Sequence, residues 1–255
     1  MVIRRGKANR LSGRDAEPRL LGKIQAGDPR GKTFIRYSSF GRLGKRPVIA
    51  LRTSHDTNTP DEILKISKRL SRAGILVPEI VGVSKSGVIS FSRIGSRKKG
   101  VYENSLMGAL RRLLSIQGKN PSANRQLRRL LSSAARTIGT MHSIGILHNH
   151  PHFLNLVASK SRIGVIDLKY ASEVKIDWRN PKEAAKILSE DYRWIVTSFR
   201  ELGIHGKSYD RAYIQRYAEL SRNFILKIVS KYPMDERRKD VFILEIARMT
   251  QTGFE

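Results

Sequence analysis

The chain has 255 residues, which is enough for one large domain or two small lobes, and its 40% hydrophobic content predicts a folded protein. It contains no cysteine, which excludes disulfides and cysteine-ligated metal sites and fits a reducing compartment, and no apolar run is long enough to predict a membrane-spanning helix. The 49 Lys and Arg residues outnumber the 22 Asp and Glu residues, so the formal charge of +27 favours anionic partners such as nucleic acid, anionic lipid or phosphorylated glycans.

The first third of the chain is predicted to be rich in strands. Residues 1–30 are basic and show no clear periodicity, so we expect them to form a loose N-terminal arm. Short apolar runs bounded by glycine-containing turns then follow as far as about residue 100, a pattern typical of strands. The runs predict strands at residues 32–40, 46–54, 75–83 and 86–94.

One helix is predicted between these strands, in "NTPDEILKISKRLSRAG" at residues 58–74. Thr59 can cap its N-terminus, Pro60 suits the first turn, and Glu62 completes a capping box. An apolar stripe along this helix predicts that one face is buried.

The remainder of the chain is predicted to be mainly helical. Residues 125–143 carry apolar side chains at helical spacing, and further helices are expected at about residues 182–202, 209–231 and 235–250. A short apolar strand, "RIGVID", interrupts the helices and ends at Asp167.

Three histidines at alternate positions, His148, His150 and His152, follow the helix at residues 125–143. Side chains at alternate positions of an extended strand share a face, so a zinc or similar metal site is one interpretation. Pro151 disfavours it because proline interrupts a regular strand, and no acidic cluster lies nearby in the sequence. The adjacent letters H-N-H are not a nuclease motif, because that motif spreads its histidines over a larger ββα unit.

A second interpretation comes from the order of residues in 141–168, "MHSIGILHNHPHFLNLVASKSRIGVIDL". This segment resembles the catalytic loop and metal-binding strand of the protein-kinase-like superfamily, and most of all small bacterial lipopolysaccharide-core (heptose) and other sugar kinases. The family pattern is a helix, then H-x-D-x-x-x-x-N, a short hairpin and an apolar strand ending in Asp. His148 matches the first position, His150 stands where the Asp is expected, Asn155 matches the asparagine, and Asp167 matches the metal-binding aspartate.

The resemblance implies an α+β, bilobal protein-kinase-like fold. Residues 31–100 would form a β-rich N-lobe with one helix on the nucleotide-phosphate side, and residues 101–255 a mainly helical C-lobe with the catalytic-loop-like segment 148–167. It also implies ATP and Mg²⁺ as cofactors. Asn155 and Asp167 would supply oxygen ligands to the metal, which bridges the nucleotide phosphates.

The resemblance assigns two residues to ATP binding. Arg52, at the end of "VIALR", stands where the family has a phosphate-holding lysine, and Glu62 is the one acid in the following helix that could pair with it. The alternative for Glu62 is the capping box described above. No G-x-G-x-x-G motif is present; "SSFGRLGK" has two glycines.

Three further residues are expected to be structural and near the site. His148 would hold the backbone near Asp167, and Asp191 would brace the catalytic loop from the helix that carries it. His152 would lie either at the mouth of the site, near phosphate or substrate, or simply in solvent.

Because His150 replaces the catalytic aspartate, two functions stay open. The first is an ATP- and Mg²⁺-dependent phosphotransferase acting on a sugar or lipopolysaccharide-core hydroxyl, with His150 in the place of the base and an anionic acceptor such as a phosphorylated glycan. The second is a catalytically silent pseudokinase that binds polyanions or proteins. We expect a cytoplasmic protein, with peripheral association at the inner face of the membrane or nucleic-acid binding as further options for its basic surface.

Overall fold

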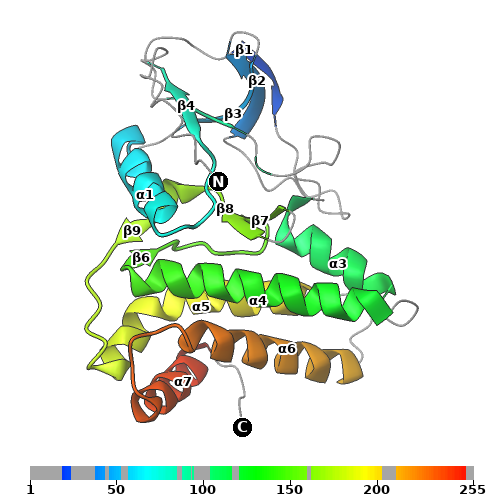
Figure 1. Cartoon of the computed structure of the whole chain (residues 1–255), viewed down its shortest axis with the longest axis vertical. Coiled ribbons are helices and arrows are strands. Elements are labelled where there is room, and N and C mark those ends of the chain that lie inside the picture. The colour runs from blue at the N-terminus through cyan, green and yellow to red at the C-terminus, as the bar shows by residue number, and fades with distance from the viewer. Residues whose placement is uncertain are drawn as a thin grey trace, which may run out of the picture. The chain divides into compact units, whose positions relative to one another are not determined.

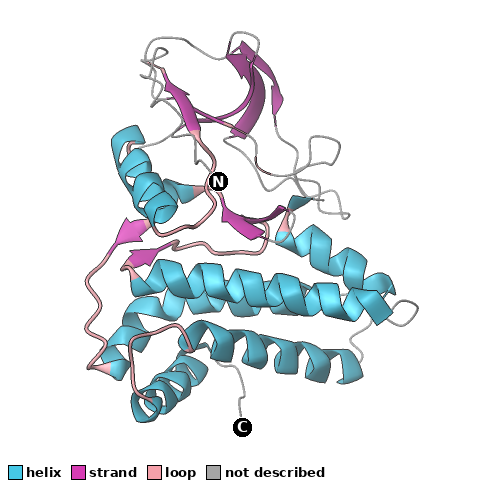
Figure 2. Ribbon diagram, viewed as in Figure 1, coloured by secondary structure: helices cyan, strands magenta, loops and turns pink. Residues whose placement is uncertain are grey.

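The computed structural model describes residues 19–23, 38–43, 46–52, 57–84, 88–92, 94, 104–116, 121–159, 162–202 and 211–250. The chain divides into two compact units, residues 1–61 with 78–93 and residues 62–77 with 94–255. Both contain described strands or helices (Figures 1 and 2), and together they make a mixed α and β structure with antiparallel sheets, consistent with the predicted α+β class.

The first unit contains a five-stranded antiparallel sheet in the order β1-β2-β3-β5-β4. Its strands are β1 (Arg19–Lys23), β2 (Ser38–Leu43), β3 (Arg46–Arg52), β4 (Ile80–Val83) and β5 (Val88–Phe91). Two of the inner strands, β3 and β5, are in register at Ala50 and Ser90, and both of these side chains are buried. Burial of β-branched and small side chains explains why these short apolar runs become strands.

Strand β1 corrects one expectation. Residues 1–30 were predicted to form a loose arm, yet Arg19–Lys23 pairs with β2 in antiparallel register. An edge strand is held by backbone hydrogen bonds to its neighbour, so it can form without the apolar periodicity that reveals a strand in a sequence. The rest of the arm lies outside the described residues.

Helix α1 (Pro60–Arg72) begins at the predicted proline and buries Ile63, Ile66 and Leu70. From Glu62 onward it belongs to the second unit rather than to the strand-rich one. Two of its contacts explain this: the Arg69 guanidinium donates to the Ile144 carbonyl at 2.7 Å, and the Lys65 amine contacts the Glu173 carboxylate at 2.8 Å. The structural division therefore differs at this helix from the predicted segment 31–100.

The described part of the second unit also contains five further α-helices. They are α3 (Leu106–Ile116), α4 (Pro121–Ser143), α5 (Pro181–Leu202), α6 (Arg211–Val229) and α7 (Glu236–Thr250). Their apolar faces meet in a core that includes Phe153, Phe199 and Phe224, whose ring centroids lie 5.0 to 5.6 Å apart. Four of these helices match the predicted ranges within a few residues, whereas α3 was not predicted. None of the described helices is long and apolar enough to cross a membrane.

Two small antiparallel ladders carry the segment between α4 and α5. Strand β6 (Ile146–Leu147) pairs with β9 (Ser172–Glu173), and β7 (Leu156–Ser159) pairs with β8 (Arg162–Val165). The chain enters β6 through Gly145, which has a φ of 72° and would collide with the Val174 carbonyl if it carried a side chain. These ladders place the loop after β6 beside the segment that follows β8.

Candidate functional site

The loop from His148 to Asn155 is joined to Asp167 through the backbone of Ile166. The Ile166 amide donates to the Asn155 carbonyl at 3.0 Å, and the His148 Nε2–H donates to the Ile166 carbonyl at 2.8 Å. Both ends of the loop therefore hold the residue immediately before Asp167. Through Ile166, the structure connects three residues, His148, Asn155 and Asp167, that were selected by the resemblance to the kinase-like pattern.

Among the described residues, one oxygen of the Asp167 carboxylate has a charged partner and the other has no hydrogen-bond partner. Its backbone lies in the left-handed region, with φ 60° and ψ 53°, which non-glycine residues adopt only at some cost. The Lys169 amine lies 3.4 Å from Oδ2. The other oxygen, Oδ1, is buried and has no hydrogen-bond partner in the structure as described. A buried oxygen of this kind requires an explanation, and a bound cation is one.

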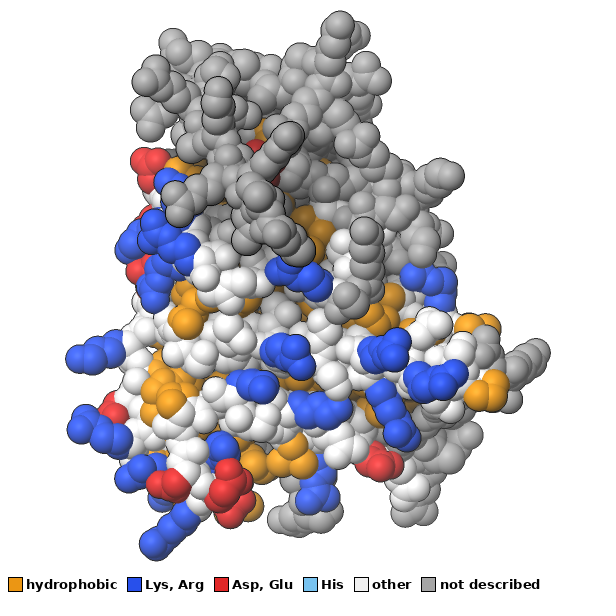
Figure 3. Space-filling view, in the orientation of Figure 1, with side chains coloured by type: hydrophobic (Ala, Val, Ile, Leu, Met, Phe, Trp, Pro, Cys, Tyr) orange, Lys and Arg blue, Asp and Glu red, His pale blue; other side chains and the backbone are white. Residues whose placement is uncertain are grey.

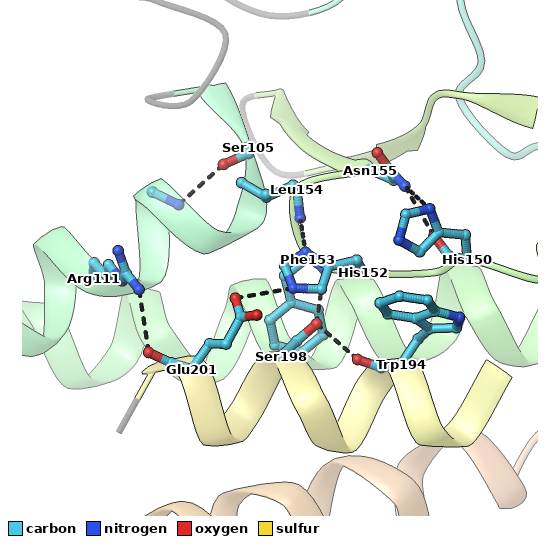
Figure 4. A network of polar contacts seen from close by, with 11 residues as sticks. Ser105, Arg111, His150, His152, Phe153, Leu154, Asn155, Trp194, Ser198 and Glu201 are labelled. Carbon is cyan, nitrogen blue, oxygen red and sulfur yellow. Dashed lines mark hydrogen bonds and ion pairs between the residues drawn. The ribbon is translucent and has the colours of Figure 1, made fainter. Parts of the chain in front are cut away.

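The Asn155 side chain is oriented by contacts within the loop. Its amide Nδ2 donates to the His150 carbonyl at 2.9 Å, and its backbone N–H donates to the His152 carbonyl at 2.7 Å. With Nδ2 directed at His150, the amide oxygen points away from that residue (Figure 4). The turn thus orients Asn155 through both its backbone and its side chain.

The donor set of these two residues fits a hard divalent cation. A carboxylate oxygen from Asp167 and an amide oxygen from Asn155 are the ligand types that Mg²⁺ prefers, and Mg²⁺ commonly uses few protein ligands beside water and substrate phosphates. Among the described residues no group of three His, Cys, Asp or Glu side chains could hold a metal ion. The residues therefore fit a metal that arrives with a phosphate ligand better than one caged by protein.

The His150 ring packs against Trp194 of α5, with the two ring centroids 4.0 Å apart (Figure 4). The pKa of His150 is lowered from 6.5 to about 4, mainly by burial and next by the neighbouring His148, while Asp167 opposes the shift. The ring is therefore neutral at pH 7. Its Nδ1 lies 3.4 Å from the Asn155 amide Nδ2, an arrangement that favours Nδ1 as acceptor and leaves the proton on Nε2.

Asp191, on α5, binds the start of the loop. Its carboxylate accepts from the backbone amides of His148 at 3.0 Å and Asn149 at 2.7 Å, and it contacts His142 Nε2 at 2.8 Å. Asp191 is almost fully buried, and three donors offset the cost of removing its carboxylate from water. Asn149 has a φ of 59°, a conformation that asparagine tolerates better than most residues.

Behind Asp191, the polar contacts continue to two buried tyrosines. His142 Nδ1 lies 2.6 Å from the Tyr232 hydroxyl, which in turn lies 2.8 Å from the Tyr192 hydroxyl. Burial raises the pKa of both tyrosines, so both hydroxyls stay protonated. Sequence reasoning missed His142 and Tyr232, and a histidine in the last turn of a helix carries no motif that would have singled it out.

His152 is buried, contrary to the expectation that it would lie in solvent. It is 6% exposed; its Nε2 contacts the Glu201 carboxylate at 3.0 Å, and its Nδ1 accepts from the Leu154 amide at 3.2 Å (Figure 4). Since both ring nitrogens are engaged and His148 Nε2 binds the Ile166 carbonyl, the histidine rings have separate partners instead of converging on one point.

The two residues assigned to ATP binding are placed less completely. Arg52 ends β3, where its backbone is in register with Val88, but its side chain lies outside the described residues. Glu62 is exposed in the first turn of α1. Their pairing stays a prediction.

Comparisons with known proteins leave the function to be argued from these residues. No family model matches the chain, and no curated protein matches it. Among solved structures, the chain is similar to one described as WaaP in complex with acyl carrier protein. The sequence identity is 15%, the match covers 92% of this chain and 90% of that one, and the TM-score is 0.48. At that level the likeness assigns neither a family nor an activity.

Proposed function

We propose that this chain is a kinase-like protein that binds ATP with Mg²⁺ and transfers a phosphoryl group to a hydroxyl of a sugar or lipopolysaccharide-core acceptor. The observation that carries the proposal is the Asp167 carboxylate: among the described residues one of its buried oxygens has no hydrogen-bond partner, and the backbone amide of the preceding Ile166 donates to the Asn155 carbonyl. Two hard oxygen donors of this kind suit a cation that is itself bound to phosphate.

In this proposal each residue of the site has a separate task. When bound, Mg²⁺ supplies charge neutralisation to the nucleotide phosphates. Asp167 and Asn155 hold the metal, and Asp191 orients the loop through the amides of His148 and Asn149. Phosphoryl transfer depends mainly on positioning and electrostatics, so a site without a carboxylate base can still support it.

His150 limits the rate in this proposal. A general base works best with a pKa near the working pH, and a histidine with a pKa of about 4 is a weak proton acceptor at pH 7. The same observation favours the second candidate function, a silent pseudokinase that binds the nucleotide, or a polyanion or protein partner, without transferring phosphate.

The metal and nucleotide are tested by binding rather than by turnover. We expect Mg²⁺ and a non-hydrolysable ATP analogue together to raise the melting temperature of the full chain, because a ligand that binds only the folded state stabilises it. Asp167→Asn should remove most of this shift, since it replaces the carboxylate. Asp240→Asn, which alters an exposed carboxylate on α7, is the matched control and should keep it. Equal shifts in all three proteins would contradict the assignment of Asp167.

The two candidate functions are separated by restoring the missing carboxylate. His150→Asp should raise phosphate transfer from labelled ATP to water or to a sugar acceptor by about tenfold or more if the site is otherwise assembled. The double variant carrying Asp167→Asn as well should abolish the gain. If nucleotide binds but no transfer occurs in either the parent chain or His150→Asp, the silent function is the correct one.

A further inference from the structure

Helix α4 carries an unbalanced charge along one side. Its 23 residues include four arginines, Arg125, Arg128, Arg129 and Arg136, and no aspartate or glutamate. At about 100° per residue, the four lie within an arc of about 100°, and Arg125 and Arg136 are about 16 Å apart along the axis. All four are exposed, and none forms an ion pair within the described part of the chain.

Helix α6 and the turn that follows it add one lysine each, Lys227 and Lys231. The Lys227 amine donates to the Ser132 hydroxyl of α4 at 2.8 Å, and Ser132 lies on the same arc as the arginines. The Lys231 stem packs where a side chain on Gly139 would be, so the missing side chain at Gly139 allows this close approach. We call the four arginines with Lys227 and Lys231 the α4 basic face. Figure 3 shows Lys and Arg side chains spread over α4 and α6 with few acidic ones among them.

Exposed aliphatic side chains also lie on the elements next to α4. Leu226, directly before Lys227, is 39% exposed, and Ile116, at the end of α3, is 42% exposed. Neither α4 nor the described side chains of α6 include an exposed aromatic residue on which a base could stack. The one carboxylate of α6, Glu219, lies eight residues before Lys227, about 12 Å along the helix.

We propose that the α4 basic face docks the protein on an anionic membrane surface, with the guanidinium groups binding lipid phosphates. Guanidinium groups match phosphate oxygens in a planar, bidentate geometry and are weakly hydrated, which suits an interface. Cations on α4 and at the end of α6, together with the exposed Leu226 of α6 and Ile116 of α3, fit a lipid surface, where aliphatic groups gain by leaving water. A nucleic-acid backbone would gain nothing from those two side chains.

The test measures partition of the full chain onto vesicles by co-sedimentation. Vesicles of phosphatidylcholine mixed with phosphatidylglycerol should bind the protein, and vesicles of phosphatidylcholine alone should not. Each arginine removed should weaken binding about fivefold, so that the variant with Arg125, Arg128, Arg129 and Arg136 all changed to Gln should lose a hundredfold or more.

The matched control removes four arginines that are already ion-paired and lie elsewhere. It changes Arg179, Arg193, Arg238 and Arg248 to Gln, residues that contact Asp177, Glu190, Asp235 and Glu245 respectively. Both quadruple variants have the same formal charge, so only a specific face predicts that the control keeps most of its binding. Equal losses in the two variants would overturn the proposal in favour of bulk charge.

A neutral substitution separates a membrane from a nucleic acid. Leu226→Gln leaves the charge unchanged and should weaken vesicle binding severalfold, but it should leave binding to a DNA duplex unaltered. If the α4 variant loses DNA binding while Leu226→Gln binds vesicles like the parent chain, the face is a nucleic-acid surface and the proposal is wrong. Nucleotide-dependent stabilisation of the same variants is measured in parallel. If the α4 variant keeps its nucleotide-dependent stabilisation, the function proposed for the Asp167 site and the role proposed for the α4 basic face are independent of each other.

Discussion

At the scale of single residues, the protonation of His150 decides what the loop can do. Its ring is half-buried against Trp194, and the neutral form is favoured because charging it would place a cation in a poorly solvated position. The nitrogen free to accept a proton faces the Asn155 amide. The ring is therefore placed to orient Asn155, whatever its part in proton transfer.

The lowered pKa makes a prediction about stability. The folded-state pKa of about 4 lies below the ordinary value of 6.5, so the unfolded chain binds more protons between these two values. Stability gained from the neutral ring is present above pH 6.5 and is lost as the pH falls toward 4. We expect the melting temperature of His150→Gln to fall less than that of the parent chain between pH 7 and pH 4.5. Parallel curves would show that His150 titrates normally.

Lys169 is the second residue whose charge matters at the site. Its amine lies 3.4 Å from the Asp167 carboxylate and 5.1 Å from the centroid of the Tyr170 ring, and its side chain is 14% exposed. This ammonium competes with any divalent cation for the Asp167 carboxylate, because both neutralise the same charge.

Removing the Lys169 ammonium should therefore strengthen metal binding at Asp167. We expect Lys169→Met to bind Mn²⁺ alone severalfold more tightly than the parent chain, as measured by the paramagnetic signal of free Mn²⁺ at increasing protein concentration. Lys186→Met removes an exposed lysine on α5 and serves as the control for net charge. Unchanged Mn²⁺ affinity in Lys169→Met would mean that the Asp167–Lys169 contact has no influence on the site.

At the scale of secondary-structure elements, α5 holds the catalytic-loop-like segment to the helical core. Asp191 binds two loop amides, and it binds the last turn of α4 through His142. Ser198, about two turns further along α5, accepts from the Phe153 amide at 3.0 Å. Two positions on one helix therefore fix both halves of the loop, and the pairing of β7 with β8 returns the chain to Asp167.

This bracing is tested by removing the Asp191 carboxylate. Asp191→Ala leaves buried donors on His142, His148 and Asn149 without their acceptor, and we expect it to lower the free energy of unfolding by about 3 kcal/mol or more. Glu190→Ala removes an exposed carboxylate from the neighbouring position on α5 and should change it by less than about 0.5 kcal/mol. Urea unfolding followed by circular dichroism measures both, and equal effects would mean that the buried network contributes nothing special.

At the scale of the whole molecule, the charge is the property that the composition revealed first. A formal charge of +27 predicts attraction to anionic partners but says nothing about where on the surface they bind. The periodicity of α4 shows that its arginines share one side, while the contact between Lys227 and Ser132 shows which neighbouring cations join them. The proposed docking on an anionic surface therefore depends on how α4 and α6 pack against each other.

Several features could be predicted from the sequence because their causes are local. Pro60 in the first turn of α1 and the apolar stripes of α1, α4, α5, α6 and α7 predicted these helices, since a helix buries residues at a fixed spacing. Helix α3 was missed, as was the edge strand β1, which is held by pairing with β2. The resemblance to the kinase-like pattern selected His148, Asn155 and Asp167, which the structure connects through Ile166.

Only the tertiary structure decided what surrounds those residues. Trp194, Glu201 and Tyr232 lie between 44 and 90 residues from the histidines that they contact, and no short motif relates such positions. The sequence by itself determined the helices and the order of the candidate site residues, because both depend on neighbours along the chain. Packing decided that His150 is neutral, that His152 is buried and that one oxygen of Asp167 has no hydrogen-bond partner within the described part of the chain, because burial and charge depend on segments brought together from afar.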